Sequence, residues 1–139
     1  MAIFFHEENV YSGLNRKRAI KLWIKNVIIL ENKIPGIINI ILTSDEDLRK
    51  INIDYLERDY FTDIITFNYT ENRVISGDLF ISLDRVNENA LKYTEDRDIE
   101  LLRVMIHGVL HLIGYDDSSI EDKKLMREKE NNCLTTFAG

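Results

Sequence analysis

The segment from Thr94 to Gly114 constrains the fold more than any other part of the chain. Thr94, Glu95 and Asp96 predict the start of a helix, and Gly114 predicts its end, because glycine readily adopts the left-handed conformation that follows many helices. A helix that is apolar on most of its surface must be surrounded by other elements. We therefore expect a central core helix, whose large apolar residues are Ile99, Leu101, Leu102, Val104, Met105, Ile106, Val109, Leu110, Leu112 and Ile113.

Other segments carry the periodicities expected of elements packed around this helix. Apolar residues at helical spacing predict helices over 15–31 and 84–93, and one from Ser44 to about Arg58, where Ser44 and Asp47 resemble a capping box. We expect residues 119–134 to form a last, charged helix. Short, β-branched runs predict strands over 37–42, 64–67 and 78–82, and we expect the last two strands to pair. The stretch Lys33-Ile34-Pro35-Gly36 separates the first helix from the first of these strands.

Length and composition set the fold class. The 139 residues, 45% hydrophobic and 30% charged, suit one domain over 1–139 that buries about two-thirds of its unfolded surface. The order of the elements predicts an α+β fold. We expect a small mixed sheet of about four strands packed with about five helices.

Cysteine usage and the N-terminal sequence bear on the compartment. Cys133 is the only cysteine, so an internal disulfide or a cysteine-rich metal site is excluded. The start MAIFFHEENV becomes acidic too early for a signal peptide, and no stretch approaches the roughly 20 apolar residues of a membrane span. We expect a cytoplasmic protein that is neither exported nor embedded in a membrane.

The net charge of −6 disfavours a generic, tight binder of nucleic acid, because such binding depends on cationic side chains. A local basic group is nevertheless present near the start of the first helix. We interpret it as the solvated face of an amphipathic helix, and we expect Trp23 and Phe67 to be core residues rather than stacking platforms. The basic group comprises Arg16, Lys17, Arg18, Lys21 and Lys25.

The central helix carries a single polar stripe. Glu100, Arg103, His107 and His111 follow one another at steps of three and four residues, so they share one face. Residues four apart are separated by roughly 6 Å along the axis, which allows two imidazoles to converge on one ion. A lone helical histidine is usually a hydrogen-bonded core residue, but two on the only polar stripe of a core helix favour a metal site.

A third ligand must come from outside this helix face. Gly114 reverses the chain, and Asp116 and Asp117 then lie within reach of the helix end. One of these carboxylates would complete a three-ligand site with open positions, which is typical of catalytic rather than structural metal centres. Zinc peptidases with the motif HExxH place a glutamate after the first histidine, where this chain has Gly108, so a peptidase of that kind is disfavoured.

Residues 107–117, with the sequence HGVLHLIGYDD, resemble the motif H-G-x-L-H-L-x-G-Y-D-H of the YbeY family of bacterial endoribonucleases and ribosomal-RNA maturation factors. The resemblance extends over roughly residues 37–132. Further positions that match the family pattern are Asn52, Tyr55, 62–67, 77–79, Ala90, Glu100, Glu121, Met126 and Glu130.

The chain departs from the family pattern at two positions. The resemblance implies His107, His111 and Asp117 as metal ligands, with Asp117 in place of the family's third histidine and Asp116 as the alternative oxygen ligand. It implies one zinc ion, although an oxygen ligand makes iron or manganese more competitive, and nickel also stays open. Leu56 stands where the family has an arginine, and we interpret the nearby Arg58 as a solvated charge.

The resemblance implies a single-strand-specific endoribonuclease that uses a metal-activated water. Its expected role is maturation of the 3′ end of small-subunit ribosomal RNA and ribosome quality control, with ribosomal RNA and the small subunit as partners and no membrane. Beyond the metal ligands, no catalytic residue is assigned. Two alternatives stay open: a metallohydrolase of another substrate class, and a non-catalytic ribosome-assembly factor with a structural metal, which the absent arginine favours.

Overall fold

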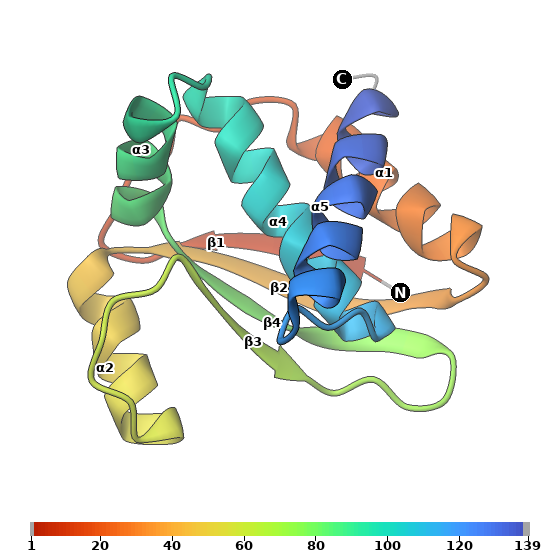
Figure 1. Ribbon diagram of the computed structural model, residues 1–139, viewed down its shortest axis with the longest axis horizontal. Coiled ribbons are helices and arrows are strands. Elements are labelled where there is room, and N and C mark those ends of the chain that lie inside the picture. Colours follow the sequence, from red (N-terminus) through yellow and green to blue (C-terminus); the bar gives the residue numbers. More distant parts are fainter. Residues whose placement is uncertain (1, 138–139) are drawn as a thin grey trace.

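The computed structural model describes residues 2–137, which form one mixed sheet and the helices around it (Figure 1). The predicted α+β class is confirmed. In chain order the elements are β1 (Ala2–Glu7), α1 (Lys17–Leu30), β2 (Ile34–Thr43), α2 (Asp45–Leu56), β3 (Ile64–Asn68), β4 (Val74–Ser82), α3 (Leu83–Lys92), α4 (Arg97–Ile113) and α5 (Ile120–Thr135).

The four strands lie in the order β1-β2-β4-β3. β1 and β4 both run parallel to β2, whereas β3 is antiparallel to β4, with Ile65 opposite Phe80. The predicted pairing of the third and fourth strands is therefore confirmed. Helices α1, α3, α4 and α5 lie on one side of the sheet, and α2 contacts β3, β4 and α3 (Figure 1).

The central helix of the fold is α4, as its apolar surface predicted. It packs on β3 and β4 and also contacts α1, α3 and α5. It packs tightly on the sheet at Gly108, where an added Cβ would lie 2.7 Å from Ile64 Cδ1 and 3.0 Å from Leu79 Cδ2. A side chain at this position would press on the ends of Ile64 and Leu79, so the close packing here favours glycine over the glutamate of an HExxH motif. The helix ends at Gly114, whose φ of 123° favours glycine.

The strands depart from the expectations in three ways, one of which is that β4 begins at Val74 rather than at Asp78. β1 was not predicted, because its residues lie on an edge strand whose partner is more than thirty positions away, as the pair Ala2 and Ile37 shows. β2 begins at Ile34 and includes Pro35, which precedes the first residue paired with β1. The missing N–H of Pro35 therefore removes no hydrogen bond from that edge of the strand.

The two faces of the sheet differ. The face beneath the helices is apolar and fully buried, and the side chains that form it include Ile38, Ile40, Leu42, Leu79 and Ile81. The opposite face is partly open: Phe4 and Ile37 are exposed there, and His6 Nε2 lies 3.1 Å from Asn39 Oδ1. None of the helices within residues 2–137 is long and apolar enough to cross a membrane.

Candidate metal centre and cleft

Three potential ligand atoms meet beside the last turn of α4. His107 Nε2 lies 3.1 Å from His111 Nε2, and Asp117 Oδ2 lies 3.4 Å from the first nitrogen and 3.5 Å from the second. Ligands at about 2.0–2.1 Å from a tetrahedral ion are separated from one another by about 3.3 Å. The triangle thus has the size required to hold one such ion, and these residues form the only group of at least three potential ligands found within the described part of the chain.

Glu130, on α5, fixes the orientation of His107. Its Oε2 lies 2.7 Å from His107 Nδ1, and a carboxylate only accepts, so Nδ1 donates and the neutral ring keeps its lone pair on Nε2. Burial opposes protonation of His107, but the hydrogen bond and negative charge of Glu130 outweigh it and raise the pKa of the histidine. A carboxylate behind a ligating histidine is the usual second layer of a metal site.

The loop after α4 brings Asp117 to the histidines. Tyr115 donates a hydrogen bond to Glu31 at the end of α1, and Lys129 of α5 lies 3.6 Å from Glu31 Oε2 and 5.4 Å from the centre of the Tyr115 ring. This contact ties the loop to both flanking helices. Asp116 is directed elsewhere, since its carboxylate accepts from the Asp117 N–H at 2.8 Å and from the Ser118 hydroxyl at 3.0 Å.

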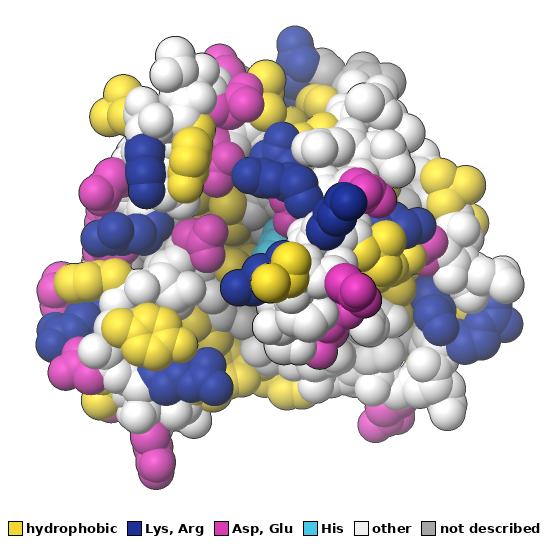
Figure 2. All heavy atoms as spheres, viewed as in Figure 1, with side chains coloured by type: hydrophobic (Ala, Val, Ile, Leu, Met, Phe, Trp, Pro, Cys, Tyr) yellow, Lys and Arg dark blue, Asp and Glu magenta, His cyan; other side chains and the backbone are white. Residues whose placement is uncertain are grey.

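The triangle stands at one end of a cleft of about 290 Å³ between α3, α4, α5 and the start of β3. Figure 2 shows this hollow near the centre of the view, with histidine at its base and lysine and arginine side chains at its rim. The cleft is lined by Asp63, Asn89, Tyr93, Glu100, Arg103, Val104, His107, Asp117, Lys123, Met126, Arg127 and Glu130.

Cationic side chains surround Glu130 at the wall of the cleft. Arg103 Nη1 lies 3.3 Å from Glu130 Oε1 and donates to Asn131 Oδ1 at 2.8 Å, and Arg127 Nη1 lies 3.4 Å from the same Glu130 oxygen. Burial disfavours the Glu130 carboxylate, but its hydrogen bonds with His107 and Arg103 outweigh burial and hold its pKa below the ordinary value. Glu130 is therefore an ionised carboxylate at neutral pH.

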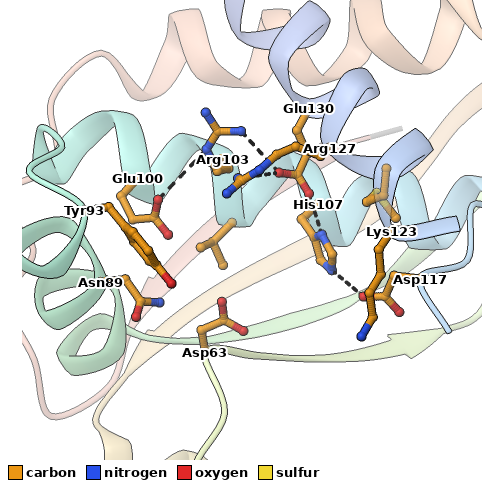
Figure 3. A pocket seen from close by; sticks show the side chains of 12 residues that line it. Asp63, Asn89, Tyr93, Glu100, Arg103, His107, Asp117, Lys123, Arg127 and Glu130 are labelled. Carbon is orange, nitrogen blue, oxygen red and sulfur yellow. Dashed lines mark hydrogen bonds and ion pairs between the residues drawn. The ribbon is translucent and has the colours of Figure 1, made fainter. Parts of the chain in front are cut away.

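Two other carboxyls in the cleft have a pKa above, rather than below, the ordinary value. Burial raises the pKa of Asp63, at the start of β3, although the nearby His107 lowers it in part. Burial likewise raises the pKa of Glu100, with Arg103 opposing the shift and Asp63 adding to it. Figure 3 shows Asp63 between the histidine end of the cleft and the end that contains Glu100, Asn89 and Tyr93.

The structure brings His107, His111 and Asp117 together but leaves other candidates outside the cleft. Trp23 is a core residue, only 4% exposed, whereas Phe67 is half-buried and packs edge-on against Phe80. The basic group at the start of α1 contributes nothing to the lining, and neither do Leu56 and Arg58.

Some cleft residues had no role predicted from the sequence. Glu130 and Asp63 matched the family pattern without an assigned chemistry, and Arg103 was placed on the polar stripe. Lys123 and Arg127 lie on a charged helix whose periodicity is weak, so no pattern distinguished their side of α5 from the other. Asn89 and Tyr93 lie at the end of α3, and only the packing of α3 against α4 brings them to the cleft.

Comparison with known proteins gives a consistent result. A family model described as endoribonuclease YbeY matches residues 6–138. A relative of that name from Parabacteroides distasonis is 46% identical over 134 residues, covering 96% of this chain and 94% of the relative. Another, from Flavobacterium johnsoniae, is 44% identical over 135 residues, covering 97% and 96%.

A solved structure also matches. The solution structure of a Thermotoga maritima protein covers 96% of this chain and 87% of its own, with a TM-score of 0.68 and 28% sequence identity. The family match, the relatives and the fold agree over nearly the whole length. The chain therefore belongs to the endoribonuclease YbeY family.

Proposed function

We propose that this chain is a metal-dependent endoribonuclease that cleaves single-stranded RNA and matures the 3′ end of small-subunit ribosomal RNA. As a member of its family it is a nuclease that hydrolyses RNA phosphodiester bonds. The observation that carries the metal dependence is the triangle of His107 Nε2, His111 Nε2 and Asp117 Oδ2, with edges of 3.1, 3.4 and 3.5 Å, at one end of an open cleft.

The donor set supports a divalent ion of borderline softness. Two imidazole nitrogens and one carboxylate suit zinc, and the oxygen ligand also suits iron or manganese. We propose one zinc ion held by His107, His111 and Asp117. Three protein ligands leave positions open, and the chemistry supplied at such a site is activation of water and neutralisation of charge on a phosphoryl oxygen.

The residues of the chain then have separate tasks. Glu130 keeps the proton of His107 on Nδ1 and so directs the lone pair of Nε2 towards the triangle. Lys123 and Arg127, at the rim of the cleft, place positive charge where a phosphodiester backbone enters. Asp63, whose raised pKa favours the protonated form, is the carboxyl placed to exchange a proton with the substrate.

Ribosomal RNA and the small ribosomal subunit are the proposed partners, within the cytoplasm and in ribosome quality control. The family membership supports this assignment. Leu56 stands at the position of the family's arginine and supplies no charge. Positive charge in the cleft comes instead from Arg103, Lys123 and Arg127, which line it.

Metal content and RNA cleavage test the proposal together. Purified protein should contain about one equivalent of metal and cleave labelled single-stranded RNA, and a chelator should abolish cleavage. Replacing His107 and His111 together by Ala should remove both metal and activity. The matched control is His6→Ala, because His6 is the remaining histidine and lies on the open face of the sheet.

Equal metal content in the double variant and the wild type would refute the site. Metal loss without any effect on RNA cleavage would refute its catalytic role. For the cellular substrate, loss of this chain should cause small-subunit RNA with an unprocessed 3′ end to accumulate, and the His6→Ala protein, unlike the double variant, should restore processing. Normal 3′ ends without the chain would contradict the assignment to ribosomal RNA.

A further inference from the structure

Strand β3 lies at one end of the sheet, and no other strand of the described chain pairs with its outer edge (Figure 1). Two hydrogen bonds of 2.9 Å show which of its residues face β4: the Ser82 N–H donates to the Asp63 carbonyl, and the Tyr69 N–H donates to the Ser76 carbonyl. Facing residues of an antiparallel pair are alternately bonded and non-bonded, so the odd-numbered residues of β3 bond to β4. The residues whose backbone groups point to the free edge are Ile64, Thr66 and Asn68.

Two of these residues offer both of their backbone groups at the free edge. The Ile64 carbonyl accepts from the Thr62 hydroxyl at 3.4 Å. The N–H and C=O groups of Thr66 and Asn68 have no hydrogen-bond partner among the residues that the structure describes. Thr66 is half-buried and Asn68 is exposed, so the edge is accessible. Each of the two residues therefore presents one donor and one acceptor to an incoming molecule.

The free edge of β3 lies next to the metal centre. Helix α4 packs on β3, with Gly108 against Ile64, and the Thr70 hydroxyl just after β3 lies 3.5 Å from the Leu112 carbonyl. The strand thus follows the turns of α4 that carry the two histidines. Figure 3 shows that Asp63, which directly precedes β3, faces the same cleft as the metal centre. An RNA strand with a phosphate at the metal centre would therefore pass along this edge.

The edge matches an RNA backbone in spacing and in chemistry. Thr66 and Asn68 are two residues apart, so their outward groups repeat at about 7 Å along the strand, close to the distance between successive phosphates of an extended RNA strand. Phosphate oxygens accept from N–H groups, and ribose 2′-hydroxyls can donate to C=O groups. An extended polypeptide could also pair with a free edge. The position beside the metal centre of a nuclease favours RNA.

We propose that the free edge of β3 binds the sugar–phosphate backbone of the substrate. The N–H groups of Thr66 and Asn68 donate to successive phosphates, and their C=O groups accept from ribose 2′-hydroxyls. This inference rests on the proposed function, since it concerns RNA at the same metal centre. These contacts involve no base, so they should support binding of every sequence. They should favour RNA over DNA, because DNA lacks the 2′-hydroxyl.

The response of individual amides tests the inference on the wild type. In NMR spectra of the zinc-loaded protein, oligouridylate should shift the amide signals of Thr66 and Asn68 and slow their hydrogen exchange. The amides of Ile65 and Phe67 should change less, because they already bond to β4. The spectra are recorded at low temperature, and the integrity of the RNA is checked afterwards. Bound RNA that left the Thr66 and Asn68 amides unchanged would overturn the inference; an extended peptide that changed them instead would identify a protein as the occupant.

A proline substitution removes one of the proposed donors. Thr66→Pro eliminates the outward N–H without breaking a hydrogen bond to β4, and proline is tolerated at such edge positions. Fluorescence anisotropy should show that it binds labelled oligouridylate about tenfold more weakly, because a hydrogen bond to a charged group is lost. Thr66→Val is the matched control: it removes the hydroxyl but keeps the N–H, and its affinity should stay within about twofold of the wild type.

The outcomes of this pair of variants differ. Wild-type affinity in folded Thr66→Pro would overturn the inference. An equal loss in Thr66→Val would assign the effect to the side chain and would also overturn it. Melting temperatures show whether each variant is folded, and if Thr66→Pro is not, the amide measurement on the wild type decides.

The proposed contact with the 2′-hydroxyl is tested by changing the sugar. The wild type should bind oligouridylate about fivefold more tightly than its deoxyribose counterpart. Single 2′-deoxy substitutions should reproduce this loss at adjacent nucleotides and have little effect elsewhere. Thr66→Pro should keep the preference for RNA, because the phosphate that it no longer binds is common to both. Equal affinity for RNA and DNA would overturn the inference and leave the nuclease function intact, whereas failure to bind either would overturn the proposed function as well.

Discussion

The two ends of the cleft are built on the same helix but in opposite ways. At the histidine end, His107 is held by Glu130, Glu130 is held by two arginines, and a tyrosine ties down the loop that carries Asp117. At the other end, about 10 Å along the axis of α4 by the helical rise, Glu100 has no hydrogen-bond partner within the described chain. The side chains of the first end are held by one another, whereas the carboxyl of Glu100 is not.

The two ends should also contribute differently to the stability of the fold. Hydrogen bonds to charged groups stabilise a fold by about 1.5–3 kcal/mol each, so the histidine end contributes to stability as well as to geometry. Burial of the Glu100 carboxyl has the opposite effect, because it disfavours the ionised form and raises the pKa. Cleft residues therefore need not all stabilise the fold. Substitutions at the two ends should change stability and metal binding in different combinations.

The largest effect should follow from a change behind the metal site. Glu130→Gln removes the negative charge that orients His107 and leaves Arg103 and Arg127 facing a neutral amide. We expect zinc affinity to fall about ten- to a hundredfold, as measured by competition with a chromophoric chelator. Glu128→Gln, two residues earlier on the same helix, is the control and should bind zinc as the wild type does; an unchanged affinity in Glu130→Gln would mean that the histidine end is not pre-oriented.

A smaller change should follow at the residue where this chain departs from its family pattern. Asp117→His replaces an oxygen ligand by nitrogen and should shift the preference towards zinc over manganese by about tenfold, because nitrogen ligands suit zinc better. Competition between the two metals, measured by elemental analysis after dialysis, gives the ratio. An unchanged ratio of the two metals in Asp117→His would contradict a role of Asp117 as a ligand.

The smallest effect should be a gain in stability. Because burial raises the pKa of Glu100 in the folded state, its ionisation opposes folding above that pKa. Glu100→Gln should therefore raise the free energy of unfolding at pH 7 by on the order of 1 kcal/mol. The gain should shrink as the pH falls through the folded-state pKa towards 4.5, the ordinary value of a glutamate, where the wild-type side chain is protonated in both states. Denaturant unfolding at several pH values measures this, and a gain that grew on acidification would contradict the assignment.

Much of the fold was predictable because it depends on local patterns. The apolar surface of α4, its end at Gly114 and the alternation of short strands and helices were sufficient for the α+β class. The early part of β4 was missed because Val74 to Gly77 lie next to polar residues and lack a clear strand pattern. β1 was missed because its pairing with β2 is long-range, and one short apolar run does not reveal its partner.

The candidate site likewise has a part that the sequence could predict and a part that it could not. His107 and His111 could be placed together because helical spacing alone sets their separation. Asp117 depended on the family motif for its choice over Asp116, and the structure supplies a local reason, since the Asp116 carboxylate is occupied by the loop itself. The contacts of Glu130 with His107, and of α3 with the cleft, depend on how three helices pack, and no single-helix periodicity contains that information.

The attachment of the Asp117 loop has a consequence for how the protein is made. Tyr115 contacts Glu31 near the start of the chain and Lys129 near its end, and Glu130 follows directly after Lys129. During synthesis, α4 emerges before α5, so a nascent chain contains both histidines while their orienting carboxylate is still inside the ribosomal tunnel. The hydrogen bond between His107 and Glu130 therefore forms only after α5 has left the tunnel and packed against α4.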